Sequence, residues 1–313
     1  MEALYARDVY GKTLVELGRK DHDIVVLDAD LSGSTRTIVF GKEFPERFVN
    51  FGVAEQNMMA AAAGLASCGK IVFASTFAMF ATARVLDQVR NSICYNNFNV
   101  KIVATHAGLT VGEDGASHQA LEDVNFLRAI PNMKIIVPCD AKEARSAVIA
   151  AYQTKGPFYI RLGRSKTNVL EDKKDFVLGK GYTFGGQSRG DVAIIACGIM
   201  VEQALLAAGK LKNKGISATV ANIHTIKPID ADFIVELARN HEALLICEEH
   251  QAIGGLYSAV CEVLASRFPR RAVSVAVNDS FGQSGSPKEL LEFYGLTADS
   301  IAAKTEELLR EQD

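Results

Sequence analysis

Short continuous apolar runs alternate with helical patterns along most of this chain, and this alternation limits the folds open to it. The runs IVVLDAD (24–30), KIVFAS (70–75) and NVKIVATH (99–106) are typical of strands buried on both faces. Similar runs predict strands at 48–53, 133–138 and 157–162. Helices are expected at 3–19, 54–69, 80–95, 119–129 and 141–154. The pattern predicts an α/β fold with a mainly parallel sheet and helices on both faces.

A polar, glycine-rich segment interrupts this alternation between residues 163 and 190. The alternation restarts at DVAIIACG and continues towards the end of the chain. A length of 313 residues is enough for about two domains, each with its own core. We therefore expect two three-layer αβα domains, the first over residues 1–168 and a smaller one over 189–313, with a linker at 169–188.

Charge, hydropathy and cysteine content exclude several classes of protein. The 34 basic and 37 acidic residues nearly cancel, which argues against a nucleic-acid partner. No apolar run is long enough for a membrane helix, and MEALYARDVYGK is typical of an amphipathic helix rather than a signal peptide, so we expect a cytoplasmic protein with no membrane partner. The six cysteines form no CxxC pair and no zinc-ligand spacing, which predicts reduced thiols and no metal site in this chain.

Polar and aromatic residues follow several of the predicted strands, where open α/β sheets bind their ligands. They are Asp30, Ser34, Glu55, Phe77, Phe80, His106 and Arg161. Hydroxyl, carboxylate, imidazole, guanidinium and aromatic groups together are typical of a site for a polar or anionic ligand.

The segment THAGLTVGEDGASHQALED (105–123) carries the strongest chemical signal. His106 and His118 flank a glycine-rich acidic loop that contains Asp114. Imidazole and carboxylate groups in one small volume suit hydrogen bonding to sugar hydroxyls and proton transfer near neutral pH. The alternative is a surface loop with solvated acids and locally packed histidines.

Glu55 and the Phe77–Phe80 pair each allow a functional and a structural interpretation. Glu55 opens a predicted helix just after a strand, where the helix dipole alone favours an acid. Phe77 and Phe80 are three residues apart and share one helix face. They would form either an apolar wall for a flat heteroaromatic ring or an ordinary core pair.

These segments, in this order, resemble the C-terminal half of transketolases. The resemblance rests on ADLSGS, FGVAEQNM, STFAMF, ATHAGLTVGEDGASHQALED and AIPNMKIIVPCD, and in the second half on TIKPID, LICEEH and IGGLYSAV. It covers almost the whole chain and implies a pyrimidine-binding domain followed by a C-terminal domain with a mixed sheet. Full-length transketolases carry a Gly-Asp-Gly…Asn motif for magnesium and diphosphate in an N-terminal domain, and no Gly-Asp-Gly occurs here. The chain therefore resembles one subunit of a split transketolase.

The resemblance also implies a cofactor, partners and residue roles. Thiamine diphosphate would be shared with an N-terminal partner subunit that binds Mg²⁺, in an α2β2 assembly acting on sugar phosphates. Glu55 would hydrogen-bond the aminopyrimidine N1′ and promote formation of the cofactor ylide, Phe77 and Phe80 would stack on the pyrimidine, and Asp30 would lie near the thiazolium. His106, Asp114 and His118 would hold the donor sugar, and Arg7, Ser34 and Arg161 would hold its phosphate.

One departure from the family pattern lies beside the phenylalanines, where Ala83 replaces the usual aromatic residue. This change would leave the pyrimidine wall open or let another side chain fill it.

The implied reaction is transfer of a two-carbon ketol unit between a ketose phosphate and an aldose. Two enzyme alternatives share this half-site: the β subunit of a 2-oxoacid dehydrogenase and a 1-deoxyxylulose-5-phosphate synthase-like enzyme. A degenerate module that binds a phosphosugar or a partner without catalysis is the non-enzymatic alternative.

Overall fold

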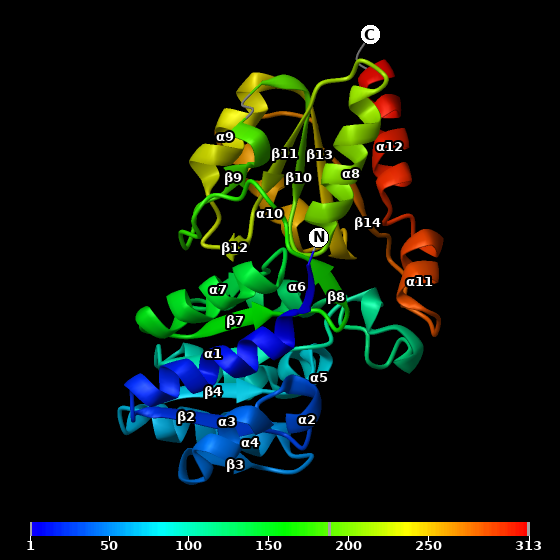
Figure 1. Cartoon of the computed structure of the whole chain (residues 1–313). Helices are drawn as coiled ribbons and strands as arrows, with labels where there is room; N and C mark the ends of the chain where they lie inside the picture. Colours follow the sequence, from blue (N-terminus) through cyan, green and yellow to red (C-terminus); the bar gives the residue numbers. More distant parts are fainter. Residues whose placement is uncertain (1, 187–188, 312–313) are drawn as a thin grey trace.

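The computed structural model describes residues 2–186 and 189–311. Six strands from the first half and β12 from the second half build a seven-stranded sheet in the order β12-β6-β7-β5-β4-β2-β3 (Figure 1). Its strands are β2 (Ile24–Asp28), β3 (Phe48–Asn50), β4 (Ile71–Ser75), β5 (Val100–Ala104), β6 (Lys134–Ile136), β7 (Phe158–Arg161) and β12 (Thr225–Lys227). All neighbours are parallel except β12, which pairs antiparallel with β6. The expectation of a mainly parallel first sheet is confirmed.

Helices cover both faces of this sheet because the strands are apolar on both sides. One face is covered by α1 (Ala6–Lys20), α3 (Ile38–Glu43) and α7 (Ala141–Gln153), whose buried side chains include Tyr10, Leu14, Phe40 and Val148. The other face carries α4 (Glu55–Ser67), α5 (Ala78–Thr82) and α6 (Asp123–Arg128), packed through residues such as Met58, Ala81 and Leu127.

Two predicted helices differ from the structure. Residues 3–5, expected at the start of a helix, form β1 (Ala3–Tyr5) and pair antiparallel with β8 (Lys166–Asn168), a partner that lies far along the chain. The helix expected at 80–95 is broken into α5, a 3₁₀ turn at Ala83–Val85 and a π-helix at Gln88–Cys94.

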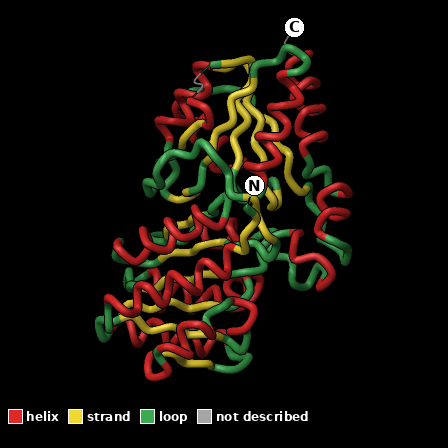
Figure 2. Tube along the Cα trace, viewed as in Figure 1, coloured by secondary structure: helices red, strands yellow, loops and turns green. Residues whose placement is uncertain are grey.

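The second half builds a mixed sheet in the order β14-β13-β10-β11-β9, which forms a separate group of strands in Figure 2. Its strands are β9 (Tyr182–Thr183), β10 (Gly190–Ala196), β11 (Ala218–Asn222), β13 (His241–Gln251) and β14 (Val273–Val277), and only β9 among them runs antiparallel to its neighbour. The helices around it are α8 (Met200–Lys212), α9 (Ala231–Asn240), α10 (Leu256–Arg267), α11 (Pro287–Phe293) and α12 (Ala298–Arg310). The expected second αβα layer arrangement with a mixed sheet is confirmed.

The two halves share apolar packing. One cluster of buried side chains contains Leu27 and Ile135 from the first half together with Ile246 and Val260 from the second. Strand β9 lies inside the segment expected as a linker, and the expected domain limits of 1–168 and 189–313 stay a prediction.

Two smaller findings concern membranes and thiols. Within residues 2–186 and 189–311, the helices are all too short or too polar to cross a bilayer. All six cysteines are free; Cys94, Cys139, Cys197 and Cys247 are buried, Cys261 is half-buried and Cys68 is exposed.

Candidate functional site

Strands β4 and β5 end side by side, and the residues that follow them form the centre of the site. Backbone pairing continues past the strands, since the Ala78 N–H donates to Thr105 O at 2.8 Å and the Thr105 N–H donates to Thr76 O at 3.1 Å. This pairing brings Phe77 and His106 into contact, with ring centroids 3.8 Å apart and the planes inclined by 20°.

The aromatic pair and both histidines form one cluster. The Phe77 and Phe80 rings are stacked with centroids 6.1 Å apart, and His118 meets the ring of Phe80 edge-on at 5.4 Å. Phe77 is buried and Phe80 is half-buried. Loop 105–123 thus returns both imidazoles to the phenylalanines that the sequence singled out.

His106 is held in a single protonation state. Burial, followed by the positive charges of Arg7 and Arg164, lowers the pKa of His106 to about 3. Its Nε2 lies 3.5 Å from Nη1 of Arg7, and its Nδ1 lies 2.9 Å from the hydroxyl of Thr105. Because a guanidinium can only donate, Nε2 is the acceptor and the neutral ring carries its proton on Nδ1.

Arg7 joins Ser34 to this cluster. Its Nη1 donates to the Ser34 carbonyl at 3.4 Å, and its Nε is buried without a hydrogen-bond partner among the described residues. Burial lowers the pKa of Arg7, and Arg36 lowers it further. A half-buried guanidinium whose buried Nε has an unused donor fits an anionic ligand.

Arg164 is a site residue that the sequence reasoning missed. Its Nη1 lies 3.1 Å from the Glu113 carboxylate and also donates to the Val111 carbonyl, and its charge acts on both His106 and Arg7. The signal was available, because Arg164 follows strand β7 at the same edge of the sheet as the other candidates.

Arg161, by contrast, lies outside this cluster. Its side chain is 7% exposed, its Nε donates to Asp123 at 2.8 Å, and its Nη2 donates to the carbonyls of Ala120 and Glu249, both at 3.0 Å. These contacts engage Nε and Nη2 of Arg161 within the chain, and its expected phosphate role stays a prediction.

Glu55 is the first residue of α4, and its side chain is only 4% exposed. Its carboxylate accepts a hydrogen bond of 2.8 Å from Arg84, whose guanidinium lies 4.4 Å above the centre of the Phe80 ring. Arg84, which the sequence reasoning did not single out, therefore links the acid to the aromatic wall. Its neighbour Ala83, at the place of the usual aromatic residue, is exposed.

Asp30 and Asp114 are both exposed. Asp30 follows β2 with a positive φ of 64°, and its N–H donates to the side chain of Asn50 at 3.0 Å. Asp114 ends the 3₁₀ turn Leu109–Asp114, next to the Glu113 that pairs with Arg164. Both carboxylates remain accessible from outside the chain.

The donor set fits the pyrimidine half of a thiamine cofactor. Stacked phenylalanine faces suit a flat heteroaromatic ring, and a buried carboxylate beside them can accept a hydrogen bond from a protonated ring nitrogen. Among the residues that the structure describes, no group of three or more His, Cys, Asp or Glu is placed to hold a metal ion.

Comparisons with known proteins agree with this geometry. The family "Transketolase, pyrimidine binding domain" matches residues 2–169, and "Transketolase, C-terminal domain" matches residues 185–301. A putative transketolase C-terminal section from Methanocaldococcus jannaschii is 48% identical over 310 residues, which cover 98% of this chain and 96% of that protein. A 6-deoxy-6-sulfo-D-fructose transketolase subunit from a Clostridium species is 40% identical, with 98% and 95% covered.

A solved structure is similar along the whole chain. It is described as a split gene transketolase in an inactive β4 tetramer, and it matches with a TM-score of 0.89, 49% identity and 100% coverage of both chains. Transketolases use thiamine diphosphate, in keeping with the pyrimidine-binding domain found here. The chain belongs to the transketolase family, as the C-terminal section of a split transketolase.

Proposed function

We propose that this chain supplies the pyrimidine side of a thiamine-diphosphate site and transfers a two-carbon ketol unit from a ketose phosphate to an aldose. An N-terminal partner subunit would bind the diphosphate and Mg²⁺, and two copies of each chain would form an α2β2 enzyme. The observation that carries this proposal is the convergence of Glu55, the Phe77–Phe80 pair, both histidines and Arg7 at one edge of the first sheet.

Glu55 and the aromatic pair would bind the cofactor ring. Thiamine diphosphate, when bound, supplies the nucleophilic carbon that attacks the ketose carbonyl and holds the two-carbon unit. The Glu55 carboxylate would accept a hydrogen bond from the protonated N1′ of the bound aminopyrimidine and so favour the tautomer needed for activation. To do so it exchanges its contact with Arg84, which is exposed enough to move aside. Phe77 and Phe80 would stack on the aminopyrimidine ring, and Asp30 would lie near the thiazolium.

The neighbouring polar residues would bind the sugar phosphate. Neutral His106 offers Nε2 to a sugar hydroxyl, whereas His118, which is partly exposed, is suited to moving protons during C–C cleavage. Asp114 accepts from another hydroxyl. Arg7, Ser34 and Arg164 bind the phosphate, since arginine forks make bidentate bonds to phosphate oxygens.

Two observations support the need for a partner subunit. No Gly-Asp-Gly segment occurs in the sequence, although thiamine-dependent chemistry requires a site for the diphosphate and its metal. The similar solved chain is described as inactive in a tetramer of β chains alone.

The test is ketol transfer from xylulose 5-phosphate to ribose 5-phosphate in the presence of thiamine diphosphate and Mg²⁺. The chain is assayed alone and with a co-expressed protein that carries the Gly-Asp-Gly motif. Activity is expected only in the mixture, and Glu55→Gln should lower kcat/KM by about 10²–10⁴-fold without changing assembly. Glu46→Gln, at an exposed acid near β3, is the matched control.

Near-normal activity of the Glu55→Gln enzyme would overturn the cofactor assignment. Turnover with pyruvate but not with xylulose 5-phosphate would favour an oxoacid or deoxyxylulose-type enzyme. An assembled complex without turnover on either donor would favour the non-catalytic module.

A further inference from the structure

We propose that the second half of the chain positions the sugar-binding loop of the first half. Loop 105–123, which carries His106, Asp114 and His118, is held at one end by Glu249 and at the other by Arg161. We call these contacts of Glu249 and Arg161 with loop 105–123 the clamp. Its role in sugar binding rests on the proposed function, but whether it holds the loop can be tested without measuring activity.

Glu249 lies near the end of β13 and is 5% exposed. Its Oε1 accepts the backbone N–H of Thr110 at 2.6 Å, across the boundary between the two halves. Gly108 makes this approach possible, because a Cβ at that position would lie 2.3 Å from the Glu249 carboxyl carbon. Gly108 also has φ +81°, a conformation that other residues rarely adopt.

Arg161 holds the other end of the loop. Its Nη2 donates to Ala120 O within the loop and to the backbone O of Glu249, both at 3.0 Å. The Gly108 N–H donates to the same Ala120 carbonyl at 3.0 Å and so closes the base of the loop. A buried guanidinium with these partners joins the loop to β13.

Further contacts from the second half support the middle of the loop. Nε2 of Gln119 lies 2.9 Å from the carbonyl of Gln283, and the Ser284 hydroxyl donates to Glu113 O at 2.6 Å. Both of these contacts cross from loop 105–123 to the second half of the chain. The loop is therefore shaped by the second half, although all its candidate sugar ligands belong to the first.

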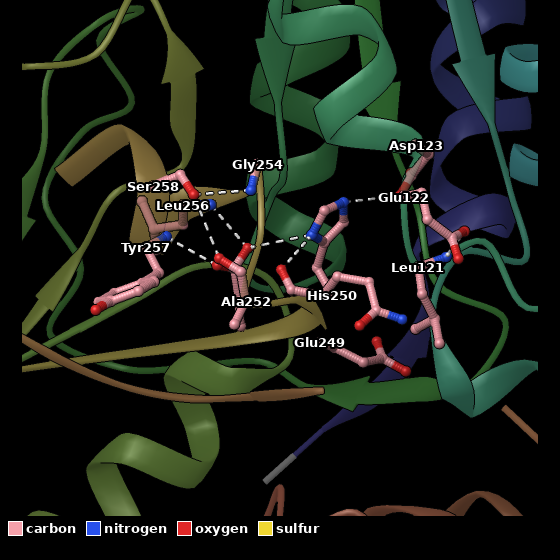
Figure 3. A network of polar contacts seen from close by, with 12 residues as sticks. Leu121, Glu122, Asp123, Glu249, His250, Ala252, Gly254, Leu256, Tyr257 and Ser258 are labelled. Carbon is pink, nitrogen blue, oxygen red and sulfur yellow. Dashed lines mark hydrogen bonds and ion pairs between the residues drawn. The ribbon is translucent and has the colours of Figure 1, made fainter. Parts of the chain in front are cut away.

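The adjacent Glu248 provides a matched comparison. It is equally buried, but its carboxylate accepts the N–H groups of Leu256 and Tyr257 at 2.7 and 2.8 Å, at the start of α10. Nδ1 of His250 lies 3.8 Å from the Glu248 carboxylate, and its Nε2 faces Asp123 at 3.9 Å, as Figure 3 shows for His250 and Asp123. Loss of Glu248 removes a buried acid from the same strand without removing a contact to the loop.

The first test is amide hydrogen exchange in the full chain without its partner. Glu249→Ala should speed exchange in a peptide spanning 105–123 by about tenfold or more, because the Thr110 N–H loses its acceptor. Glu249→Gln keeps an acceptor oxygen and should restore exchange to within about threefold of wild type. Glu248→Ala should speed exchange around 256–258 and leave peptide 105–123 unchanged.

A double-mutant cycle tests the close approach directly. Gly108→Ala alone forces Cβ against the carboxylate, whereas in the Glu249→Ala background that space is free. Gly108→Ala should therefore speed amide exchange in the loop about tenfold less in the Glu249→Ala background than in the wild-type chain. Equal effects in both backgrounds would overturn the clamp.

In the reconstituted enzyme, Glu249→Ala should raise KM for xylulose 5-phosphate by about tenfold and affect kcat less, because the loop would bind the donor less well. Faster exchange in peptide 105–123 with both Glu249→Ala and Glu248→Ala would overturn the proposal, since general destabilisation would explain it. Faster exchange specific to Glu249→Ala in a chain without ketol-transfer activity would support the clamp while rejecting the proposed function.

Discussion

His106 combines an unusual backbone conformation with a defined protonation state. Its φ of 57° lies in the left-handed region, which non-glycine residues seldom occupy. Stacking on Phe77 and the contacts to Thr105 and Arg7 hold it there. Strained residues of this kind concentrate at functional sites, where the surrounding structure stabilises them.

We predict that the His106 ring stays neutral in the folded protein across the pH range in which the protein works. With the pKa lowered from 6.5 to about 3, its NMR ring signals should not shift between about pH 8 and about pH 5. Unfolding lets the ring take up a proton between these two pKa values. The contribution of His106 to stability is therefore present above pH 6.5 and is lost as the pH falls towards 3.

His106→Asn assigns the signal by its disappearance and should weaken the acid-side loss of stability. A ring signal that titrates near its ordinary value in the folded chain would contradict the burial argument.

At the scale of single elements, the short strand β12 links the two halves of the chain. This strand of three residues, Thr225–Lys227, comes from the second half and extends the first sheet beside β6. Ile226 is 2% exposed within the shared cluster, and Nζ of Lys227 donates to the carbonyls of Arg128 and Ile130 at 2.8 and 2.6 Å, near the end of α6. The strand thereby attaches the two halves to each other.

Ile226→Ala should lower the free energy of unfolding by about 2–4 kcal/mol, because it leaves a cavity where the halves meet. Ile253→Ala removes the same atoms from a side chain that is 67% exposed and should change stability by less than about 0.5 kcal/mol. Urea denaturation of both variants measures the difference. Similar losses in the two variants would show that β12 does not attach the halves.

At the scale of the whole molecule, the apolar core does not stop between the halves. Leu27 and Ile135 from the first sheet share a cluster with Ile246 from the second. The Arg161–Glu249 contact and β12 cross the same boundary. Domains that share a large apolar interface do not move or unfold independently, whereas domains that meet through a polar interface can.

We therefore predict that the chain unfolds in one cooperative calorimetric transition, with equal calorimetric and van't Hoff enthalpies for the unfolding unit. Scans at several chain concentrations separate unfolding from self-association. Two transitions, assignable to the two halves by limited proteolysis, would contradict the shared core.

Local patterns predicted much of the fold and the site. Continuous apolar runs mark the strands, since a strand covered on both faces needs apolar residues at every position. Residues directly after those runs, such as Glu55, Phe77 and His106, could be named because their distance from a strand end is short and local. The family resemblance then supplied chemical roles that spacing alone left open.

Other features could not be predicted because they depend on partners remote in the sequence. Residues 3–5 are extended because β8 pairs with them, and nothing in their local pattern indicates this. Arg161 and Arg164 are only three residues apart, yet one is buried against Asp123 and the other pairs with Glu113 in loop 105–123. The alternating direction of side chains along strand β7 sets the side of the sheet on which Arg161 lies, and the turn after the strand sets the side on which Arg164 lies.

The sequence by itself determined the α/β class, the mainly parallel first sheet and the strand ends at which the site residues stand, because short-range periodicity encodes them. Only the tertiary structure decided that Arg84 pairs with Glu55, that β12 joins the first sheet and that Glu249 reaches loop 105–123. These contacts join segments as much as 139 residues apart, as for Thr110 and Glu249. The last two depend on how the two sheets pack together, and the first on how α4 packs near the turn Ala83–Val85; local sequence patterns do not encode such packing.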